Sequence, residues 1–105
     1  MICRVVVTPT ASRHIDEAFA YIYERSPQNA ERWLAGVQDA IGSLRRFPRR
    51  CGIAPETRFL GEELRHFIYK SHRIIYRIES RVVRILYVRH GARRPVGDPA
   101  SEEDA

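Results

Sequence analysis

Residues 64–95, with the sequence LRHFIYKSHRIIYRIESRVVRILYVRHGARRP, constrain the fold of this chain more than any other part. Apolar and polar residues alternate there, which is the pattern of β-strands that have one buried face and one solvated face. The pattern predicts strands at about 64–70, 73–79 and 82–89. The links between them are about two residues long, so we expect antiparallel hairpins.

The polar positions of these expected strands are almost all cationic. Residues 65–96 contain nine Lys and Arg residues and one acid, Glu79. In the middle strand, Arg73 and Arg77 fall on one face, and Ile74 and Tyr76 fall on the other. We therefore expect a sheet whose solvated face is basic and meets an anionic partner.

Two amphipathic helices precede the strands. Apolar residues recur every three or four positions over residues 11–22 and again over residues 30–44. The first helix should open at Pro9 and stop at residues 26–27, because the residue before a proline avoids helical geometry. The second should end at residues 47–48, and the short connection predicts an antiparallel helical hairpin.

The remaining segments complete the expected architecture. Residues 2–7 (ICRVVV) predict a first strand, and residues 48–63, with two Pro, two Gly and no periodicity, predict a loop that crosses the molecule. The order is β-α-α-β-β-β in the α+β class, a helical hairpin packed on a small, mainly antiparallel sheet. We expect one domain over residues 1–97 and an acidic, disordered tail at 98–105.

The charge distribution narrows the choice of partner. The formal net charge is +5, and residues 1–97 alone carry 18 bases and 9 acids, which is +9. Of the 18 bases 17 are Arg, whose planar fork suits phosphate and carboxylate. Every apolar run is interrupted before it reaches membrane length, so we expect a cytoplasmic protein with no membrane partner. We interpret Cys3 as a small buried residue and Cys51 as an incidental loop residue.

Few chemistries fit this composition. The glycines form no phosphate-binding loop and the four His form no zinc pattern, so we expect no metal and no cofactor. Metal-free phosphodiester cleavage needs a base, an acid and a cation that stabilises the charged transition state. Arg73 or Arg77 could supply the cation, and His90 has a pKa suited to proton transfer. The candidates that could assist are Arg65, Tyr69 and Tyr87.

Each basic cluster also has a plainer interpretation. Arginines on an exposed strand face can serve solubility and edge protection, which is the more common role for any single one. For the cluster as a whole we favour binding. The basic segment at residues 45–50 could contact phosphate, but we favour a cationic helix C-terminus followed by a solvated loop.

Three segments carry a family resemblance: GEELRHF (61–67), HRIIYRI (72–78) and RILYVRHGARRP (84–95). In this order and spacing the chain resembles, over about residues 3–95, the ParE/RelE superfamily of type II toxin–antitoxin modules, also called plasmid-stabilisation proteins. The His-Gly-Ala-Arg ending is similar to the ParE branch. That resemblance implies a non-enzymatic toxin that inhibits DNA gyrase and is neutralised by a small cognate antitoxin, ParD-like or similar.

The RelE branch implies a different target. Its members cut mRNA on the ribosome, and the resemblance would give the catalytic role to Arg73, assisted by Arg65 and His90. The chain lacks a close pair of lysines on the preceding strand and has Gly91 where a tyrosine would follow His90, so we favour no catalytic residue. A third hypothesis is a non-toxic binding module on the same fold. We expect the contacts with target or antitoxin to come from Arg65, Arg73, Arg77, His90, Arg93, Arg94 and Trp33.

Overall fold

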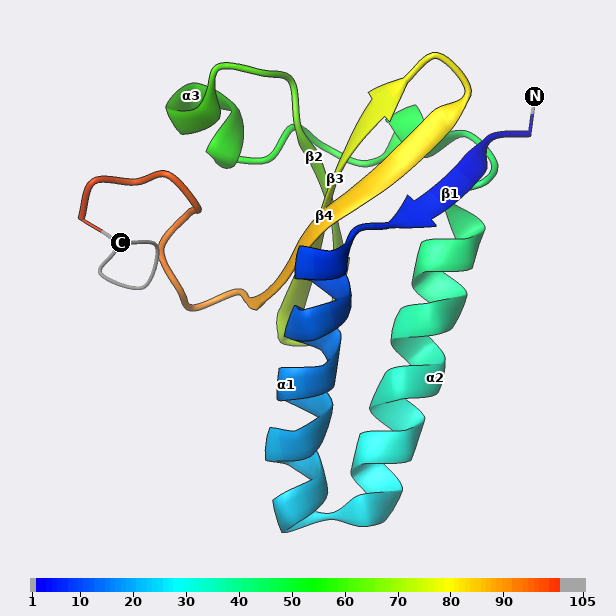
Figure 1. The fold of residues 1–105 in the computed structure, drawn as a ribbon, viewed down its shortest axis with the longest axis vertical. Helices are drawn as coiled ribbons and strands as arrows, with labels where there is room; N and C mark the ends of the chain where they lie inside the picture. Colours follow the sequence, from blue (N-terminus) through cyan, green and yellow to red (C-terminus); the bar gives the residue numbers. More distant parts are fainter. Residues whose placement is uncertain (1, 101–105) are drawn as a thin grey trace.

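The computed structural model describes residues 2–100 and confirms the expected β-α-α-β-β-β order. A four-stranded sheet has the order β1-β4-β3-β2, in which β1 runs parallel to β4 and the other pairs are antiparallel (Figure 1). Most of the predicted tail lies outside the described residues. The elements are β1 (Arg4–Val7), α1 (Pro9–Arg25), α2 (Pro27–Ser43), the 3-10 helix η1 (Pro48–Arg50), α3 (Glu56–Leu60), β2 (Arg65–Tyr69), β3 (His72–Glu79) and β4 (Val82–His90).

Proline and hydroxyl side chains set the ends of the helical hairpin. Thr8 caps α1 by accepting a hydrogen bond from the backbone N–H of Ala11 at 3.2 Å, and Pro9 occupies the first turn. Ser26 ends α1 and also caps α2, accepting from the N–H of Asn29 at 3.2 Å. One residue therefore turns the chain, and the two helices lie side by side in antiparallel directions (Figure 1).

The sheet has two faces with different covers. The helix face, covered by α1 and α2, carries the larger apolar cluster, whereas the α3 face packs against α3 and the segment after β4. Ile74 and Tyr76 lie in the first cluster and Ile75 in the second, all fully buried, as the alternating pattern predicts. A β-bulge after Ile75 pairs Tyr76 with Ile85, a shift that the sequence pattern did not predict.

The structure differs from the expected secondary structure in two segments, the end of the second helix and the loop at 48–63. The second helix ends at Ser43 rather than at residue 47, because the backbone N–H of Cys3 bonds to the carbonyl of Arg45 and Ile2 forms a bridge with Arg46. The predicted loop at 48–63 contains η1 and α3. Residues 56–60 are too short a segment to show helical periodicity, so the sequence pattern had no means of marking them.

The expectation of a solvated basic face is wrong for two arginines. Arg73 is 7% exposed and Arg89 is 3% exposed, and both lie on the α3 face beside buried Ile75. The short helix and the chain after β4 cover this part of the sheet. The alternating pattern correctly predicted the face of the sheet on which these two arginines lie. It could not predict their burial, because the segments that cover them are distant in the sequence.

Two further findings concern the described residues as a group. Cys3 and Cys51 are both free thiols, the first buried and the second half-buried. Among residues 2–100, no helix combines the length and the apolar character needed to cross a bilayer.

Candidate functional site

Arg73, the residue with the most specific sequence-based role, is held in a buried ion pair on the α3 face. Its guanidinium donates to both carboxylate oxygens of Glu56, at 2.9 and 2.6 Å, and approaches Nδ1 of His66 at 3.1 Å. Glu56 is fully buried and also accepts from the backbone N–H of Val96 at 3.0 Å. The pair therefore ties β3, α3 and the segment after β4 together.

The titration of Glu56 reflects this environment. Burial alone would raise the pKa of this carboxyl, but hydrogen bonds from Arg73 and from the N–H of Val96 outweigh it and hold the pKa below its usual value. Glu56 therefore stays ionised and neutralises Arg73. Bidentate arginine–carboxylate pairs are among the strongest charged hydrogen bonds in proteins. The guanidinium of Arg73 therefore stays bound to Glu56.

Two other arginines of this face are also paired with acids. Arg77 contacts Glu79 at 2.9 Å and Glu62 at 3.2 Å, and Arg84 contacts Glu79 at 2.9 Å. These contacts raise the pKa of Arg77 and lower the pKa of Glu79. Glu62 lies in the connection before β2. An acid from outside the strands therefore neutralises part of the positive charge that the strand sequences carry.

Arg65 lies on the helix face, not beside Arg73. The register pairs Arg65 with Tyr76, and directly opposed residues point to the same side of a sheet. Its guanidinium donates to the carbonyl oxygens of Cys51 at 2.7 Å and Arg49 at 3.1 Å. The side chain therefore anchors the chain after η1 to the edge strand.

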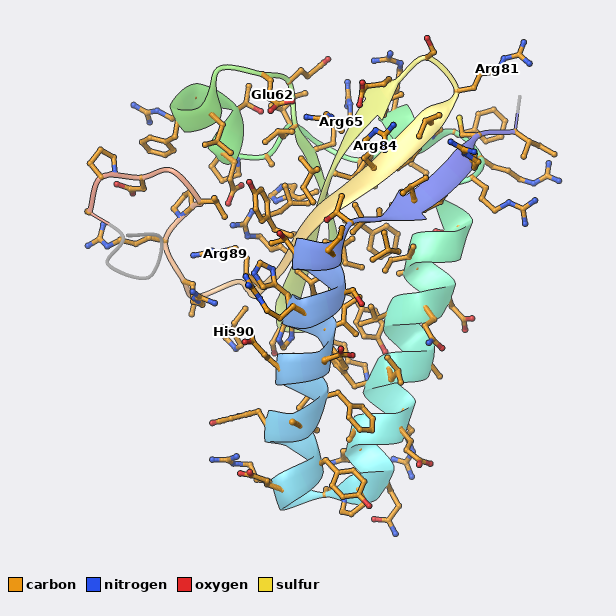
Figure 2. All side chains as sticks on the ribbon, in the orientation of Figure 1. Glu62, Arg65, Arg81, Arg84, Arg89 and His90 are labelled. Carbon is orange, nitrogen blue, oxygen red and sulfur yellow. The ribbon has the colours of Figure 1, made fainter. Side chains whose placement is uncertain are left out.

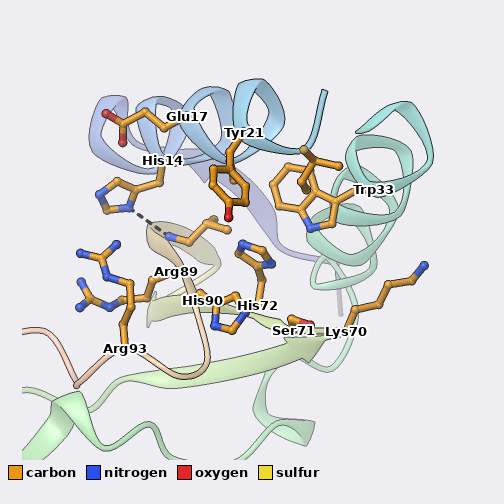
Figure 3. A pocket seen from close by; sticks show the side chains of 13 residues that line it. His14, Glu17, Tyr21, Trp33, Lys70, Ser71, His72, Arg89, His90 and Arg93 are labelled. Atoms are coloured by element: carbon orange, nitrogen blue, oxygen red, sulfur yellow. Dashed lines mark hydrogen bonds between the residues drawn. The ribbon is translucent and has the colours of Figure 1, made fainter. Parts of the chain in front are cut away.

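A pocket of about 600 Å³ lies on the helix face, where α1 and α2 meet the ends of β3 and β4 (Figure 3). It brings together Trp33, His90 and Arg93 from the predicted contact residues. Figure 2 places His90 and Arg89 at the end of β4 next to α1. The pocket is lined by His14, Glu17, Ala18, Tyr21, Ile22, Trp33, Lys70, Ser71, His72, Val88, Arg89, His90 and Arg93.

Three aromatic rings form a row along this pocket. The rings of Trp33 and His72 meet edge to face with centroids 5.1 Å apart, and His72 meets His90 in the same way at 5.4 Å. Nδ1 of His90 accepts from the N–H of Ala92 at 3.1 Å, which places the hydrogen of the neutral ring on Nε2. The indole Nε1 of Trp33 and Nδ1 of His72 are buried and have no hydrogen-bond partner.

Burial favours the neutral form of two histidines of this pocket, His72 and His14. It lowers the pKa of His72, and the neighbouring His90 lowers it further. The pKa of His14 is lowered by burial and by Arg13, and its Nδ1 accepts from the backbone N–H of Val88 at 3.2 Å. These two side chains therefore present their ring nitrogens as neutral hydrogen-bonding groups rather than as cations.

The predicted residues divide into three places. Trp33, His90 and Arg93 share the pocket; Arg73 and Arg77 lie on the α3 face; Arg65 anchors the edge strand. Arg94 is exposed in the segment after β4, where its carbonyl accepts from Arg89 at 2.8 Å. Among residues 2–100, no three His, Cys, Asp or Glu side chains are grouped so that they could bind a metal ion.

Sequence reasoning missed His14, Tyr21, His72 and Glu56. Three of these had a readable signal in the sequence. His14 and Tyr21 fall at helical spacing with Ala11 and Ala18 and therefore belong to the inner stripe of α1. His72 alternates with Ile74 and so shares its face. Glu56 had none, because nothing in the local pattern around residue 56 indicates burial.

Comparison with known proteins agrees with this architecture. The chromosomal ParDE toxin–antitoxin system from P. aeruginosa contains a chain with a TM-score of 0.70 and 13% identity, covering 85% of this chain and 96% of that one. The RelBE2 toxin–antitoxin complex from Mycobacterium tuberculosis contains a chain with a TM-score of 0.58 and 27% identity, covering 86% and 92%. No curated protein sequence matches the chain.

The family comparison covers most of the chain. The model for the ParE toxin of the type II toxin–antitoxin system parDE matches residues 5–95. The match begins in β1 and ends just after the His-Gly-Ala-Arg segment that follows β4, so it spans the helical hairpin, the sheet and the pocket between them. The chain belongs to the ParE toxin family of type II toxin–antitoxin systems.

Proposed function

We propose that this toxin acts by binding DNA gyrase rather than by cleaving RNA, and that a cognate antitoxin neutralises it. The observation that carries the choice is the state of Arg73. A cation that stabilises a charged phosphorane must contact the substrate, whereas Arg73 is 7% exposed and bonded to both oxygens of Glu56.

The positions of the two assisting residues support the same choice. Arg65 pairs with Tyr76 and His90 pairs with His72, which places both on the helix face, while Arg73 points to the α3 face. Arg65 and His90 are also separated along β3, because they are opposed to Tyr76 and His72, which lie four residues apart. A three-residue cleavage site would need these groups within reach of one phosphate.

An antitoxin partner follows from family membership and from charge. Both related structures are described as parts of toxin–antitoxin systems, and the chain carries a net charge of +5. A positively charged toxin attracts an acidic partner over a distance, which raises the association rate more than the final affinity.

The test is a pair of assays on one preparation. We expect purified toxin to inhibit supercoiling by DNA gyrase at near-stoichiometric amounts, and to leave mRNA intact during in vitro translation. Codon-positioned cuts on translated mRNA, with gyrase unaffected, would instead establish the ribosome-dependent endonuclease. That second candidate is favoured by the 27% identity to the RelBE2 chain.

Variants of the buried pair separate chemistry from folding. Arg73→Ala removes the cation, whereas Glu56→Gln breaks the same pair and leaves the cation in place. If cleavage were seen, loss in Arg73→Ala alone would support catalysis by Arg73, and equal loss in both variants would show a structural role. Glu62→Gln, which removes an exposed acid that pairs with Arg77, is the control.

Induced expression without an antitoxin tests whether the chain is toxic. A gyrase-directed toxin should arrest growth, and co-expression of the cognate antitoxin should restore it. Normal growth with soluble toxin present would favour a non-toxic binding module on this fold.

A further inference from the structure

The pocket on the helix face contains two buried ring nitrogens that lack hydrogen-bond partners. They are Nε1 of Trp33, whose residue is only 6% exposed, and Nδ1 of His72. Both residues line the pocket, and the indole nitrogen is turned toward His72 (Figure 3). Buried polar groups are nearly always hydrogen-bonded, so two such atoms side by side call for an explanation.

The surrounding side chains do not satisfy these nitrogens. The indole N–H can only donate. The ring of His72 meets the indole at a 64° angle, and an aromatic face is at best a weak acceptor. On the other side, His90 meets the ring of His72 with its own Nδ1 occupied by Ala92.

We propose that this pocket binds a carboxylate from an acidic segment of a partner protein, with its oxygens accepting from Nε1–H of Trp33 and Nδ1–H of His72. The centroids of the two rings are 5.1 Å apart, so one planar group with two oxygens can serve both. Charge-assisted hydrogen bonds of this kind are shorter and stronger than neutral ones. The inference concerns this site and stands whether or not gyrase is the target.

The walls of the pocket favour a peptide as the source of the carboxylate. Ala18, Ile22 and Val88 line it together with the two rings, and about 600 Å³ is far more than a carboxylate fills. Apolar side chains that flank an Asp or Glu would occupy the remaining space. Lys70, at the turn between β2 and β3, adds a positive charge at the boundary of the pocket.

Access to the nitrogens requires a movement of one side chain. Both atoms are fully shielded from solvent. In Figure 3, Tyr21 extends from α1 toward His72, and it is 61% exposed, so it can swing aside at little cost. We infer that the entering segment displaces Tyr21, which predicts tighter binding in Tyr21→Ala.

The chain contains a single Trp, so one indole N–H signal in a ¹⁵N–¹H NMR spectrum reports on the site directly. The probe is a short blocked peptide of alternating Leu and Glu, and its matched control carries Gln in place of Glu. We expect the Glu peptide to move the indole signal saturably and to bind at least about tenfold more tightly than the Gln peptide.

Variants distinguish binding of the Glu peptide in the pocket from non-specific attraction of an acidic peptide to a basic protein. Trp33→Phe and His72→Phe keep an aromatic ring but remove the donor, and each should weaken binding of the Glu peptide about tenfold. Because Trp33→Phe also removes the indole signal, its affinity is measured by isothermal titration calorimetry. Tyr23→Phe, on the same helix as Tyr21 but outside the pocket, should bind as the unmodified protein does. Circular dichroism of each variant checks that the fold is retained.

Three results would overturn the proposal. One is an indole signal that does not move at saturating Glu peptide, and another is equal binding of the Glu and Gln peptides. The third is a larger movement with a single-stranded oligonucleotide than with the Glu peptide, which would assign the pocket to nucleic acid. If Trp33→Phe or His72→Phe does not fold, titration of Tyr21→Ala with the Glu peptide takes its place. Unchanged or weaker affinity of Tyr21→Ala for this peptide would contradict the displacement of Tyr21.

Discussion

Both faces of the sheet follow from one alternating sequence pattern, but their polar side chains differ in whether they have partners within the chain. On the α3 face, Arg73, Arg77 and Arg84 meet acids, and the deepest of them is neutralised by a buried carboxylate. On the helix face, Trp33 and His72 leave ring nitrogens without partners beside a pocket. The physical reason for the difference is that the polar groups of the α3 face are charged, whereas the ring nitrogens of the helix face are neutral.

A buried charge without a partner is too costly to persist, so the α3 face has to be completed within the chain. A neutral ring nitrogen can stay unpaired at a modest cost. The α3 face is therefore an internal structural surface, and the helix face retains a site that another molecule can complete. Predictions that separate the two faces test this contrast.

The largest effect is expected from breaking the buried pair. Glu56→Gln leaves the guanidinium of Arg73 without a countercharge, and removal of one partner of a buried pair costs about 3–5 kcal/mol. Urea unfolding measures the loss. Glu62→Gln, which removes an exposed partner of Arg77, should change the free energy of unfolding by at most about 0.5 kcal/mol. Similar losses in both variants would refute the contrast.

Truncation of the two apolar clusters compares the faces directly. Ile74 and Ile75 are both fully buried, on the helix face and the α3 face respectively. Each change to Ala should cost about 2–5 kcal/mol, with the larger loss for Ile74 because its cluster is larger and leaves less room for collapse. A negligible loss for Ile75→Ala would mean that the α3 face is not a true second core.

The end of α3 provides a smaller effect. Gly61 closes this helix with φ at +73°, in the left-handed region that side chains other than glycine avoid. Gly61→Ala should destabilise the fold by about 1 kcal/mol in thermal or urea unfolding. Gly52→Ala is the matched control, because its φ is not positive and a Cβ there meets open space. An equal loss at both positions would contradict the role of the left-handed end.

Acid should destabilise the protein in two stages, with little effect at neutral pH. The pKa values of His14, His66 and His72 are lowered, chiefly by burial, so the unfolded chain binds more protons once the pH falls through about 6.5. The free energy of unfolding therefore decreases there. The lowered pKa of Glu56 adds a second decrease below about pH 4.5, because the unfolded chain protonates first.

Urea unfolding across this pH range measures both stages. The second should shrink in Glu56→Gln, and the first should shrink in His72→Phe. Stability that rises on acidification would show that the histidines are favoured as cations in the folded chain, opposite to the direction given by their burial.

Much of the architecture was predictable because it depends on local periodicity. Pro9 identified the start of the first helix and Pro27 identified its end, and alternation placed Ile74 and Tyr76 on one face of the sheet and Arg73 on the other. The second helix begins at Pro27, inside the segment that the sequence pattern assigned to the connection at residues 26–29. The bulge after Ile75 and the helix at Glu56–Leu60 were not predictable, since the first requires strand register and the second is too short for a periodic signal. The early end of α2 likewise depends on pairing with Cys3.

The site was predictable only in part, for the same reason. Sequence alone determined that the chain has a helical hairpin, a basic alternating sheet and the motifs of a ParE-like toxin. Only the tertiary structure decided that Glu56, 17 positions before Arg73, neutralises that arginine, and that Trp33 meets His72 and His90 in one pocket. Periodicity reports the direction of a side chain, whereas burial and pairing depend on which distant segment lies across from it.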